Sequence, residues 1–148
     1  MNPHTKAYGL VPYLIKDNQI KILLCLSVAS KNKWGSLKGT KIKTETAYEC
    51  AQREFFEECS LHVETALFEE YFEQLNIDKD IGIWLVNAEN IEEMDKYFDD
   101  DTLKNNYLSW ENSKVKFYSI HNLPRIKAKQ VNLIKEITDF LKNKNPRH

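Results

Sequence analysis

A helix is predicted over residues 46–58, and it strongly constrains how this chain can fold. Thr46 and Glu49 have the spacing of a capping box, in which the threonine hydroxyl accepts the glutamate N–H and the glutamate carboxylate reaches back. Neither glycine nor proline interrupts the segment from there to Glu58. The fold must therefore pack one face of this helix against another element.

Three glutamates share one side of the predicted helix. At about 100° per residue, Glu54, Glu57 and Glu58 fall within an arc of roughly 100°. Ala47 and Ala51 project into the same sector, and such small side chains allow a loop or a sheet to come close. We therefore expect the three carboxylates to lie on a packed side of the helix, away from bulk solvent.

Like charges held this close repel one another unless a cation lies between them. Burying several carboxylates costs several kcal/mol for each one that is neither paired nor bound to a metal. Carboxylate oxygens are hard ligands that suit Mg²⁺ or Mn²⁺. A solvated acidic face is the alternative interpretation, because paired glutamates on helices usually face water.

The spacing of the flanking residues favours the metal interpretation. Gly39 is followed after five residues by Glu45, and the pair Arg53-Glu54 follows after seven more. The stretch resembles the Nudix box, G-x5-E-x7-R-E-U-x-E-E-x-G-U, in which U is a bulky apolar residue. The matching positions are Gly39, Glu45, Arg53, Glu54, Phe55, Glu57, Glu58 and Leu61.

Ser60 departs from this pattern, because the family usually has glycine there. A glycine just past a helix end adopts the left-handed conformation, which serine reaches at a cost of about 1 kcal/mol. This position carries no metal-binding group, so the departure affects the shape of the helix exit and not the chemistry directly.

The resemblance implies a metal-dependent hydrolase with roles for the matching residues. Glu54, Glu57 and Glu58 would be ligands of Mg²⁺ or Mn²⁺, and the backbone carbonyl of Gly39 would add another ligand. Glu54, or a carboxylate outside the motif, would deprotonate or orient the attacking water. Arg53 would pair with Glu45 and orient a catalytic glutamate, although a plain surface ion pair is the alternative for this arginine.

Lysines near the motif are candidates for contact with phosphate. Lys38 lies in Leu37-Lys38-Gly39, which is similar to the Pro-Lys-Gly variant of some dinucleoside polyphosphate hydrolases. We expect Lys38 to bind substrate as a point charge. Solvation explains Lys41 and Lys43 at least as well.

Other parts of the chain offer candidates that the sequence does not separate. Family members often recruit an extra carboxylate from a distant loop, and the acidic segment here supplies Glu92, Glu93, Asp99, Asp100 and Asp101. A solvated acidic loop explains most of these. Some aromatic residues are candidates for stacking on a base, but core packing is preferred for each of Trp34, Tyr71, Phe72 and Trp84.

Hydrophobic patterns predict strands on both sides of the helix. The strands are expected over residues 7–15, 20–28, 81–87 and 114–120, with one or two short ones within 61–74. Pro12 indicates an edge or a bulge in the first strand.

A C-terminal helix is predicted from Arg125 to about Lys142, with Pro124 at its start and a frayed tail over 143–148. The order of elements predicts one α/β domain over residues 1–148, with helices layered around a mixed sheet. The resemblance implies the same α/β/α sandwich.

Charge and cysteine content exclude other classes of protein. The formal net charge of −1 argues against broad electrostatic binding of DNA or RNA. The three cysteines include no C-x-x-C pair, so free thiols in a reducing cytosol are expected. The start of the chain lacks the layout of a signal peptide, and no apolar run could span a bilayer. We therefore expect a cytoplasmic protein.

The sequence favours the hypothesis of a Nudix-type hydrolase. It would cleave a phosphoanhydride in a nucleoside diphosphate linked to another moiety, by attack of water on phosphorus. About sixteen residues past the motif, some family members carry a proline for ADP-ribose or a tyrosine for dinucleoside polyphosphates. Asn76 and its neighbours match neither marker. The Lys38-Gly39 pair tilts the choice slightly towards dinucleoside polyphosphates, while nucleoside triphosphates, ADP-ribose and nucleotide sugars stay open.

Two other hypotheses belong to different classes. A non-catalytic Nudix module would sense nucleotides or bind a protein, but such modules tend to lose the carboxylates that this chain keeps. A structural α/β domain with solvated glutamates would have no tight metal site. Formation of a homodimer is an open expectation taken from the family.

Overall fold

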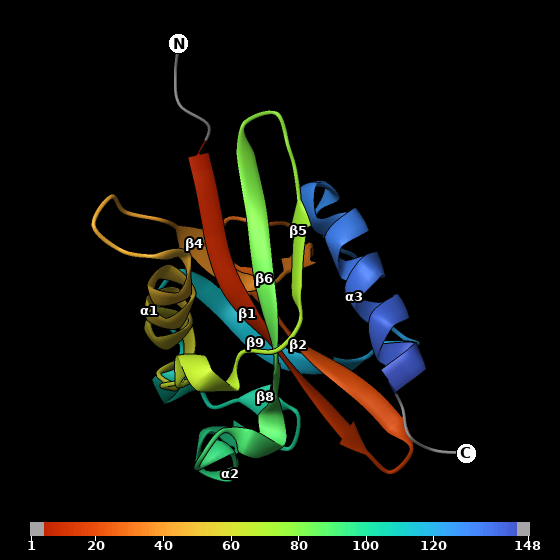
Figure 1. Ribbon diagram of the computed structural model, residues 1–148. Coiled ribbons are helices and arrows are strands. Elements are labelled where there is room, and N and C mark those ends of the chain that lie inside the picture. The colour runs from red at the N-terminus through yellow and green to blue at the C-terminus, as the bar shows by residue number, and fades with distance from the viewer. Residues whose placement is uncertain (1–4, 145–148) are drawn as a thin grey trace.

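Two long helices lie on opposite faces of one mixed β-sheet (Figure 1). The computed structural model describes residues 5–144. Helix α1 spans Ala47–Cys59 and helix α3 spans Val131–Lys144. This arrangement confirms the predicted α/β/α sandwich. No helix within the described residues is both long and apolar enough to cross a membrane.

The main path through the sheet is β5-β6-β1-β2-β9-β8-β7, with β3 paired to β2 and β4 paired to β1. Only β1 and β6 run parallel among the described pairs. The strands are β1 (Thr5–Lys16), β2 (Gln19–Ser27), β3 (Trp34–Gly35), β4 (Leu37–Thr40), β5 (Tyr71–Gln74), β6 (Lys79–Asn87), β7 (Phe98–Asp99), β8 (Thr102–Leu103) and β9 (Asn112–Ser119).

Short helical turns connect several strands. The short helix α2 spans Met94–Tyr97, within the acidic segment. Single 3-10 turns, labelled η1 to η4, cover Thr65–Leu67, Ala88–Asn90, Asn105–Tyr107 and Ala128–Gln130. The segment 61–74 therefore contains one 3-10 turn and one short strand.

The first two strands form a β-hairpin. Asp17 and Asn18 both have positive φ, at 54° and 65°. Two such residues in succession are typical of a tight turn whose twist matches the flanking strands. Aspartate and asparagine tolerate this conformation better than most residues do, so the turn sets the register between β1 and β2.

On the side away from β6, β1 changes partner along its length. Its first half pairs with β4 up to Leu10↔Leu37, and its second half pairs with β2 from Tyr13↔Ile22 onward. Pro12 lies between the two pairings, where the missing N–H of proline breaks neither antiparallel ladder. The sequence indicates an edge or a bulge at Pro12. The edge is wrong because β1 is an interior strand, and the register with β6 runs through Pro12↔Val86 without the shift that a bulge would cause.

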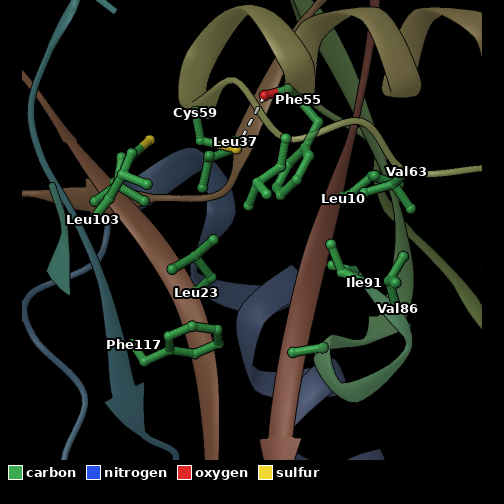
Figure 2. Close-up of a cluster of buried hydrophobic side chains, with 14 of the residues drawn as sticks. Leu10, Leu23, Leu37, Phe55, Cys59, Val63, Val86, Ile91, Leu103 and Phe117 are labelled. Atoms are coloured by element: carbon green, nitrogen blue, oxygen red, sulfur yellow. Dashed lines mark hydrogen bonds between the residues drawn. The ribbon is translucent and has the colours of Figure 1, made fainter. Parts of the chain in front are cut away.

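Strand β2 contributes to both cores because its side chains alternate between the two faces. Leu23 joins Phe55 in the cluster under α1, which Figure 2 shows. Ile22 and Leu24 join Leu133 in the cluster under α3. A central strand covered on both faces reads as a nearly continuous apolar run, and this strand has that pattern.

Helix α3 begins later than the sequence predicts. Trp34 N donates to Arg125 O at 2.8 Å, and Lys127 N donates to Trp34 O at 3.0 Å. These bonds hold the segment 125–127 extended beside β3, so Pro124 does not start the helix. Val131, the first residue of α3, is 46% exposed. At the other end, residues 143–144 are helical, while 145–148 of the expected tail lie outside the described part of the chain.

Candidate active site

Helix α1 has the ends that its sequence predicts. The Thr46 Oγ1 atom accepts the Glu49 N–H at 3.1 Å, and Glu49 Oε1 accepts the Thr46 N–H at 2.8 Å. At the other end, Ser60 has a φ of 69°, and its N–H donates to Phe56 O at 2.8 Å. The predicted capping box and left-handed exit are both confirmed. Because the two ends fix the bounds of the helix, they also fix which side chains share each of its faces.

Arg53 connects the start of the motif to the helix. Its Nε and Nη2 atoms donate to the two oxygens of Glu45 at 3.0 and 2.7 Å. Nη2 also donates to the carbonyl of Thr40 at 3.2 Å. These bonds lower the pKa of Glu45 to about 2, because the arginine stabilises the ionised carboxylate. The predicted pairing of Arg53 with Glu45 is confirmed.

The same guanidinium also contacts two candidate ligands. Arg53 Nη1 donates to Glu54 at 2.9 Å and lies 3.3 Å from both carboxylate oxygens of Glu57. One arginine therefore faces three carboxylates of the motif, while Glu58 lies deeper in the fold. The charge balance of the cluster is strongly negative.

The three glutamates differ in burial. Glu58 is only 8% exposed, the side chain of Glu54 is 16% exposed, and that of Glu57 is 54% exposed. The expectation of a packed side is confirmed for Glu58 and Glu54 and is wrong for Glu57. Glu57 instead lies at the exposed side of the cluster, where its carboxylate contacts Arg53.

Gly39 lies directly against the Glu54 carboxylate. A Cβ atom placed on Gly39 would be 1.9 Å from the Glu54 carboxyl carbon, so the site tolerates no side chain there. The Gly39 carbonyl accepts the Cys50 thiol at 3.4 Å. The need for a close approach of backbone to carboxylate explains the glycine at this position.

Glu58 holds an unpartnered oxygen in the interior. Its Oε1 atom accepts from Asn112 Nδ2 at 3.1 Å and lies 3.9 Å from the thiol sulfur of Cys25. Its Oε2 atom is buried and has no hydrogen-bond partner within residues 5–144. Burial raises the pKa of Glu58 to about 8, and the nearby negative charge of Glu54 adds to this effect.

These residues fit a hard divalent cation by their chemistry. An orphaned buried carboxylate oxygen is costly, and a cation would satisfy it. Within the described chain, no three His, Cys, Asp or Glu side chains are already gathered around one position. Arg53 accounts for this, because it holds Glu54 and Glu57 towards itself. The carboxylates that could bind a cation are therefore present, but they do not converge on one point in this structure.

Glu111 and Asn112 are site residues that the sequence did not reveal. The charge of Glu111 raises the pKa of both Glu54 and Glu58, although burial is the main cause for each. Glu111 lies directly before β9, and its carbonyl accepts the Val28 N–H at 2.8 Å. Pairing of β9 with β2 brings this segment to the helix, and no local pattern signals that pairing.

The acidic candidates proposed from sequence lie elsewhere. Glu93, Asp100 and Asp101 line a separate pocket of about 990 Å³, next to the hairpin turn of β1 and β2. Asp101 pairs with Lys21 at 2.8 Å. Glu92 and Asp99 are exposed. None of these five residues is brought to Glu58 by a contact within the described structure.

The segment that carries Lys38 crosses between two strands. Residues 34–35 pair with β2, and residues 37–40 pair with β1. At the crossing, the buried Gln130 Oε1 atom accepts both the N–H and the hydroxyl of Ser36, each at 2.8 Å. This clamp fixes the position of Lys38 two residues later. Sequence reasoning missed Gln130, which no motif distinguishes.

Lys38 lies between charges of both signs. Burial lowers the pKa of Lys38, and the nearby Lys127 and Lys79 lower it further. Glu58 acts in the opposite direction. Lys38 therefore lies within electrostatic reach of the buried glutamate. Lys43, by contrast, is exposed, as the solvation interpretation expects.

The aromatic candidates pack mainly against other rings. Trp84 is 7% exposed, and its ring lies 4.6 to 5.9 Å from the rings of Tyr8, Tyr48, Phe68 and Tyr71. Trp34 is equally buried and meets Tyr118 edge to face. Core packing is confirmed for these tryptophans. Phe72 contacts Phe140 under α3, while Tyr71 keeps an exposed edge.

No family model and no curated protein matches the sequence. Solved structures nevertheless share its fold. A C. elegans Ap4A hydrolase in a binary complex has a TM-score of 0.64 at 22% identity, covering 94% of this chain and 98% of that one. A Nudix hydrolase from Nitrosomonas europaea has a TM-score of 0.71 at 18% identity, covering 99% and 76%.

A third similar structure is the Nudix domain of Shewanella oneidensis NrtR complexed with ADP ribose. Its TM-score is 0.65 at 15% identity, and the match covers 95% of this chain and 90% of that domain. Identities this low establish the architecture alone. The chain therefore has the Nudix hydrolase fold.

Proposed function

We propose that this chain is a Nudix-type hydrolase that cleaves a phosphoanhydride in a nucleoside diphosphate linked to another moiety. The observation that supports this most strongly is the buried, unpartnered Oε2 atom of Glu58. A protein that used these glutamates only for structure would gain stability by pairing or exposing that oxygen. The Nudix fold and the motif spacing agree with this proposal.

In this proposal, Glu54, Glu57 and Glu58 would hold Mg²⁺ or Mn²⁺, together with the backbone carbonyl of Gly39. When bound, the ion would neutralise phosphate charge and make water more acidic. Arg53 belongs to the catalytic group as a positioning residue, because it holds Glu54 and Glu57 while Glu45 holds it in turn.

Proton transfer is assigned to a carboxylate. Glu54 takes a proton from the attacking water, and burial raises the pKa of Glu54, which favours proton acceptance. The water oxygen forms a bond to phosphorus, and the bridging P–O bond breaks with its electron pair on the departing phosphate. Glu111 is the second candidate for this base, since its charge acts on the same glutamates.

The positive charge of Lys38 indicates the class of substrate. Lys38 contacts phosphate oxygens from the segment clamped by Gln130, and it lies within electrostatic reach of Glu58. This supports a dinucleoside polyphosphate, the class named for the C. elegans structure of the same fold. We also place the protein in a reducing cytosol, because Cys25, Cys50 and Cys59 are buried free thiols.

A non-catalytic module is the second candidate, and one observation favours it. Arg53 occupies two of the glutamates, so the described residues hold no ready-made cluster of three ligands. Such a module would bind a nucleotide without turnover. Cleavage of a nucleotide in the presence of Mg²⁺ separates the two candidates.

The test is product release from diadenosine tetraphosphate, ADP-ribose, nucleotide sugars and nucleoside triphosphates. Each is assayed with Mg²⁺, with Mn²⁺ and with chelator. We expect metal-dependent cleavage of one class. Nucleotide binding without cleavage across the panel would favour the non-catalytic module.

A second readout does not depend on turnover. Mg²⁺ should raise the unfolding temperature of the wild type, because a ligand of the folded state stabilises it. Glu58→Gln should remove this effect. An equal rise in both proteins would contradict the assignment of Glu58.

A further inference from the structure

A groove of about 350 Å³ beside the motif is lined by lysines from distant parts of the chain. Lys33 precedes β3, Lys38 lies in β4, Lys79 begins β6, and Lys127 and Lys129 precede α3. Asp78 is the acidic residue of the lining, so the groove has a formal surplus of four positive charges. Like charges gathered by the fold repel one another, and a bound anion would relieve that repulsion.

Local partners neutralise little of this charge. Lys129 pairs with Asp78, and Lys79 Nζ donates to the Thr40 hydroxyl at 3.1 Å. Within residues 5–144, the ion pairs of the structure include none that involves Lys33, Lys38 or Lys127. Three ammonium groups of the groove therefore remain available to an anionic ligand.

The groove adjoins the glutamate cluster through Lys38. Lys127 and Lys79 act electrostatically on Lys38 from the groove, and Glu58 acts on it from the motif. The charge of Lys127 also reaches Cys25, whose sulfur lies 3.9 Å from Glu58 Oε1. A phosphate chain that starts at the glutamates therefore meets the lysines next.

The floor of the groove is held in place. Gln130 lines it and accepts two hydrogen bonds from Ser36, two residues before Lys38. A Cβ atom on Gly35 would lie 2.6 Å from the Gln130 amide nitrogen, so backbone and side chain are in close contact. The hydrogen bonds between Ser36 and Gln130 thereby hold the segments 33–38 and 127–130, which carry lysines of the groove, next to each other.

We infer that the lysine groove binds phosphate groups beyond the pyrophosphate that is cleaved, so the substrate carries three or more phosphates in a row. A two-phosphate substrate such as ADP-ribose or a nucleotide sugar would place a neutral sugar among these ammonium groups. Lysine binds phosphate as a compact point charge, without the fixed geometry of arginine, and therefore suits a flexible polyphosphate chain. The statement about the cleaved substrate rests on the proposed function. The binding of a polyphosphate in the groove does not depend on it.

The test measures binding by calorimetry in chelator, so that neither metal nor turnover contributes. The ligands are inorganic tripolyphosphate, diadenosine tetraphosphate and ADP-ribose. The test variant is Lys33→Gln with Lys127→Gln. The matched control is Lys135→Gln with Lys142→Gln, which removes the same charge from the exposed side of α3.

We expect the groove variant to bind tripolyphosphate and diadenosine tetraphosphate about tenfold more weakly, with ADP-ribose changed by less than about twofold. The control should change all three by less than about twofold. Equal weakening in both variants would mean only a general effect of net charge and would overturn the inference. Equal weakening for ADP-ribose, or no binding of tripolyphosphate by the wild type, would also overturn it.

Failure of the proposed function has a different signature. If the wild type cleaves no member of the nucleotide panel but tripolyphosphate binding follows the expected pattern, the groove is a polyphosphate site in a protein that is not a hydrolase. If the wild type cleaves ADP-ribose and tripolyphosphate does not bind, the hydrolase stands and the groove inference fails.

Discussion

The two concave regions of this molecule differ in how their charges are compensated. The larger one, of about 990 Å³, has an acidic rim, and the smaller one, of about 350 Å³, is lined by lysines. In the larger pocket, Asp101 pairs with Lys21, and Glu93 pairs with Lys96. These two acidic residues therefore have partners close by, and none of the residues that line this pocket keeps a buried oxygen without a hydrogen-bond partner within residues 5–144.

The lysine groove and the glutamate cluster are different. A surplus of positive charge lies on one side of the segment 34–40, and a surplus of negative charge lies on the other. Nearby groups of opposite charge neutralise neither surplus. Within the glutamate cluster, Glu58 keeps a buried oxygen that has no hydrogen-bond partner in the described residues. Uncompensated charge held in place by the fold, more than the size of a cavity, marks where a charged ligand and a cation would bind.

The largest effect is expected at the glutamate cluster. Glu57→Gln removes one negative charge without changing shape, so the protein should fold normally and lose turnover by about 100-fold or more. Steady-state kinetics with Mg²⁺ measures this. Glu136→Gln, on the exposed face of α3, is the matched control and should keep full activity. Near-full activity of Glu57→Gln would show that the metal site is assigned wrongly.

A smaller effect is expected at the clamp that separates the two surpluses. Gln130→Ala leaves the buried N–H and hydroxyl of Ser36 without their acceptor and should lower the free energy of unfolding by about 2 to 3 kcal/mol. Urea denaturation measures this loss. Ser36→Ala removes only one of the two bonds and should cost about half as much. A negligible loss for Gln130→Ala would mean that the segment 34–40 holds its own position.

The ion pair at the start of the motif should show a pH dependence. Arg53 lowers the pKa of Glu45 to about 2, below the unfolded value near 4.5. The carboxylate therefore contributes stability that is complete above about pH 4.5 and is lost as the pH falls through about 2. Glu45→Gln should cost about 1 to 2 kcal/mol at pH 7, and the difference from wild type should shrink towards pH 2.

Denaturation of both proteins between pH 7 and pH 2.5 measures that difference. A constant gap over this range would show that Glu45 stabilises the fold by packing and not by its charge.

The smallest effect is expected in the acidic pocket. Asp101→Asn breaks a partly exposed pair with Lys21, and such pairs contribute about 0.2 to 1 kcal/mol. Turnover should stay within about twofold of wild type, since no residue that lines this pocket holds a buried oxygen without a partner within residues 5–144. A large loss of turnover would place the pocket of about 990 Å³ in the active site and reverse the comparison drawn above.

Features encoded by neighbouring residues were predictable. Thr46 and Glu49 define the start of α1, because a capping box depends only on residues three apart. The hairpin turn at Asp17 and Asn18 also depends on neighbouring residues, and the resemblance to the Nudix box implied the pairing of Arg53 with Glu45. The mixed sheet with helices on both faces followed from the order of the elements.

Features that depend on long-range pairing were missed. Helix α3 starts late because backbone bonds to Trp34 hold residues 125–127 extended, and local patterns do not encode that partner. Pro12 indicated an edge or a bulge, since a sequence does not show that β1 changes partner at this point. The exposure of Glu57 depends on which segments the fold packs against the helix.

The sequence by itself determined the acidic helix, its ends and the residue types available for chemistry. Only the tertiary structure decided that Glu58 is the buried member, that Glu111 and Asn112 adjoin it, and that five lysines face one groove. The physical reason is range. Capping and turn geometry act over a few residues, whereas burial and electrostatic potential sum over every segment that the fold brings together.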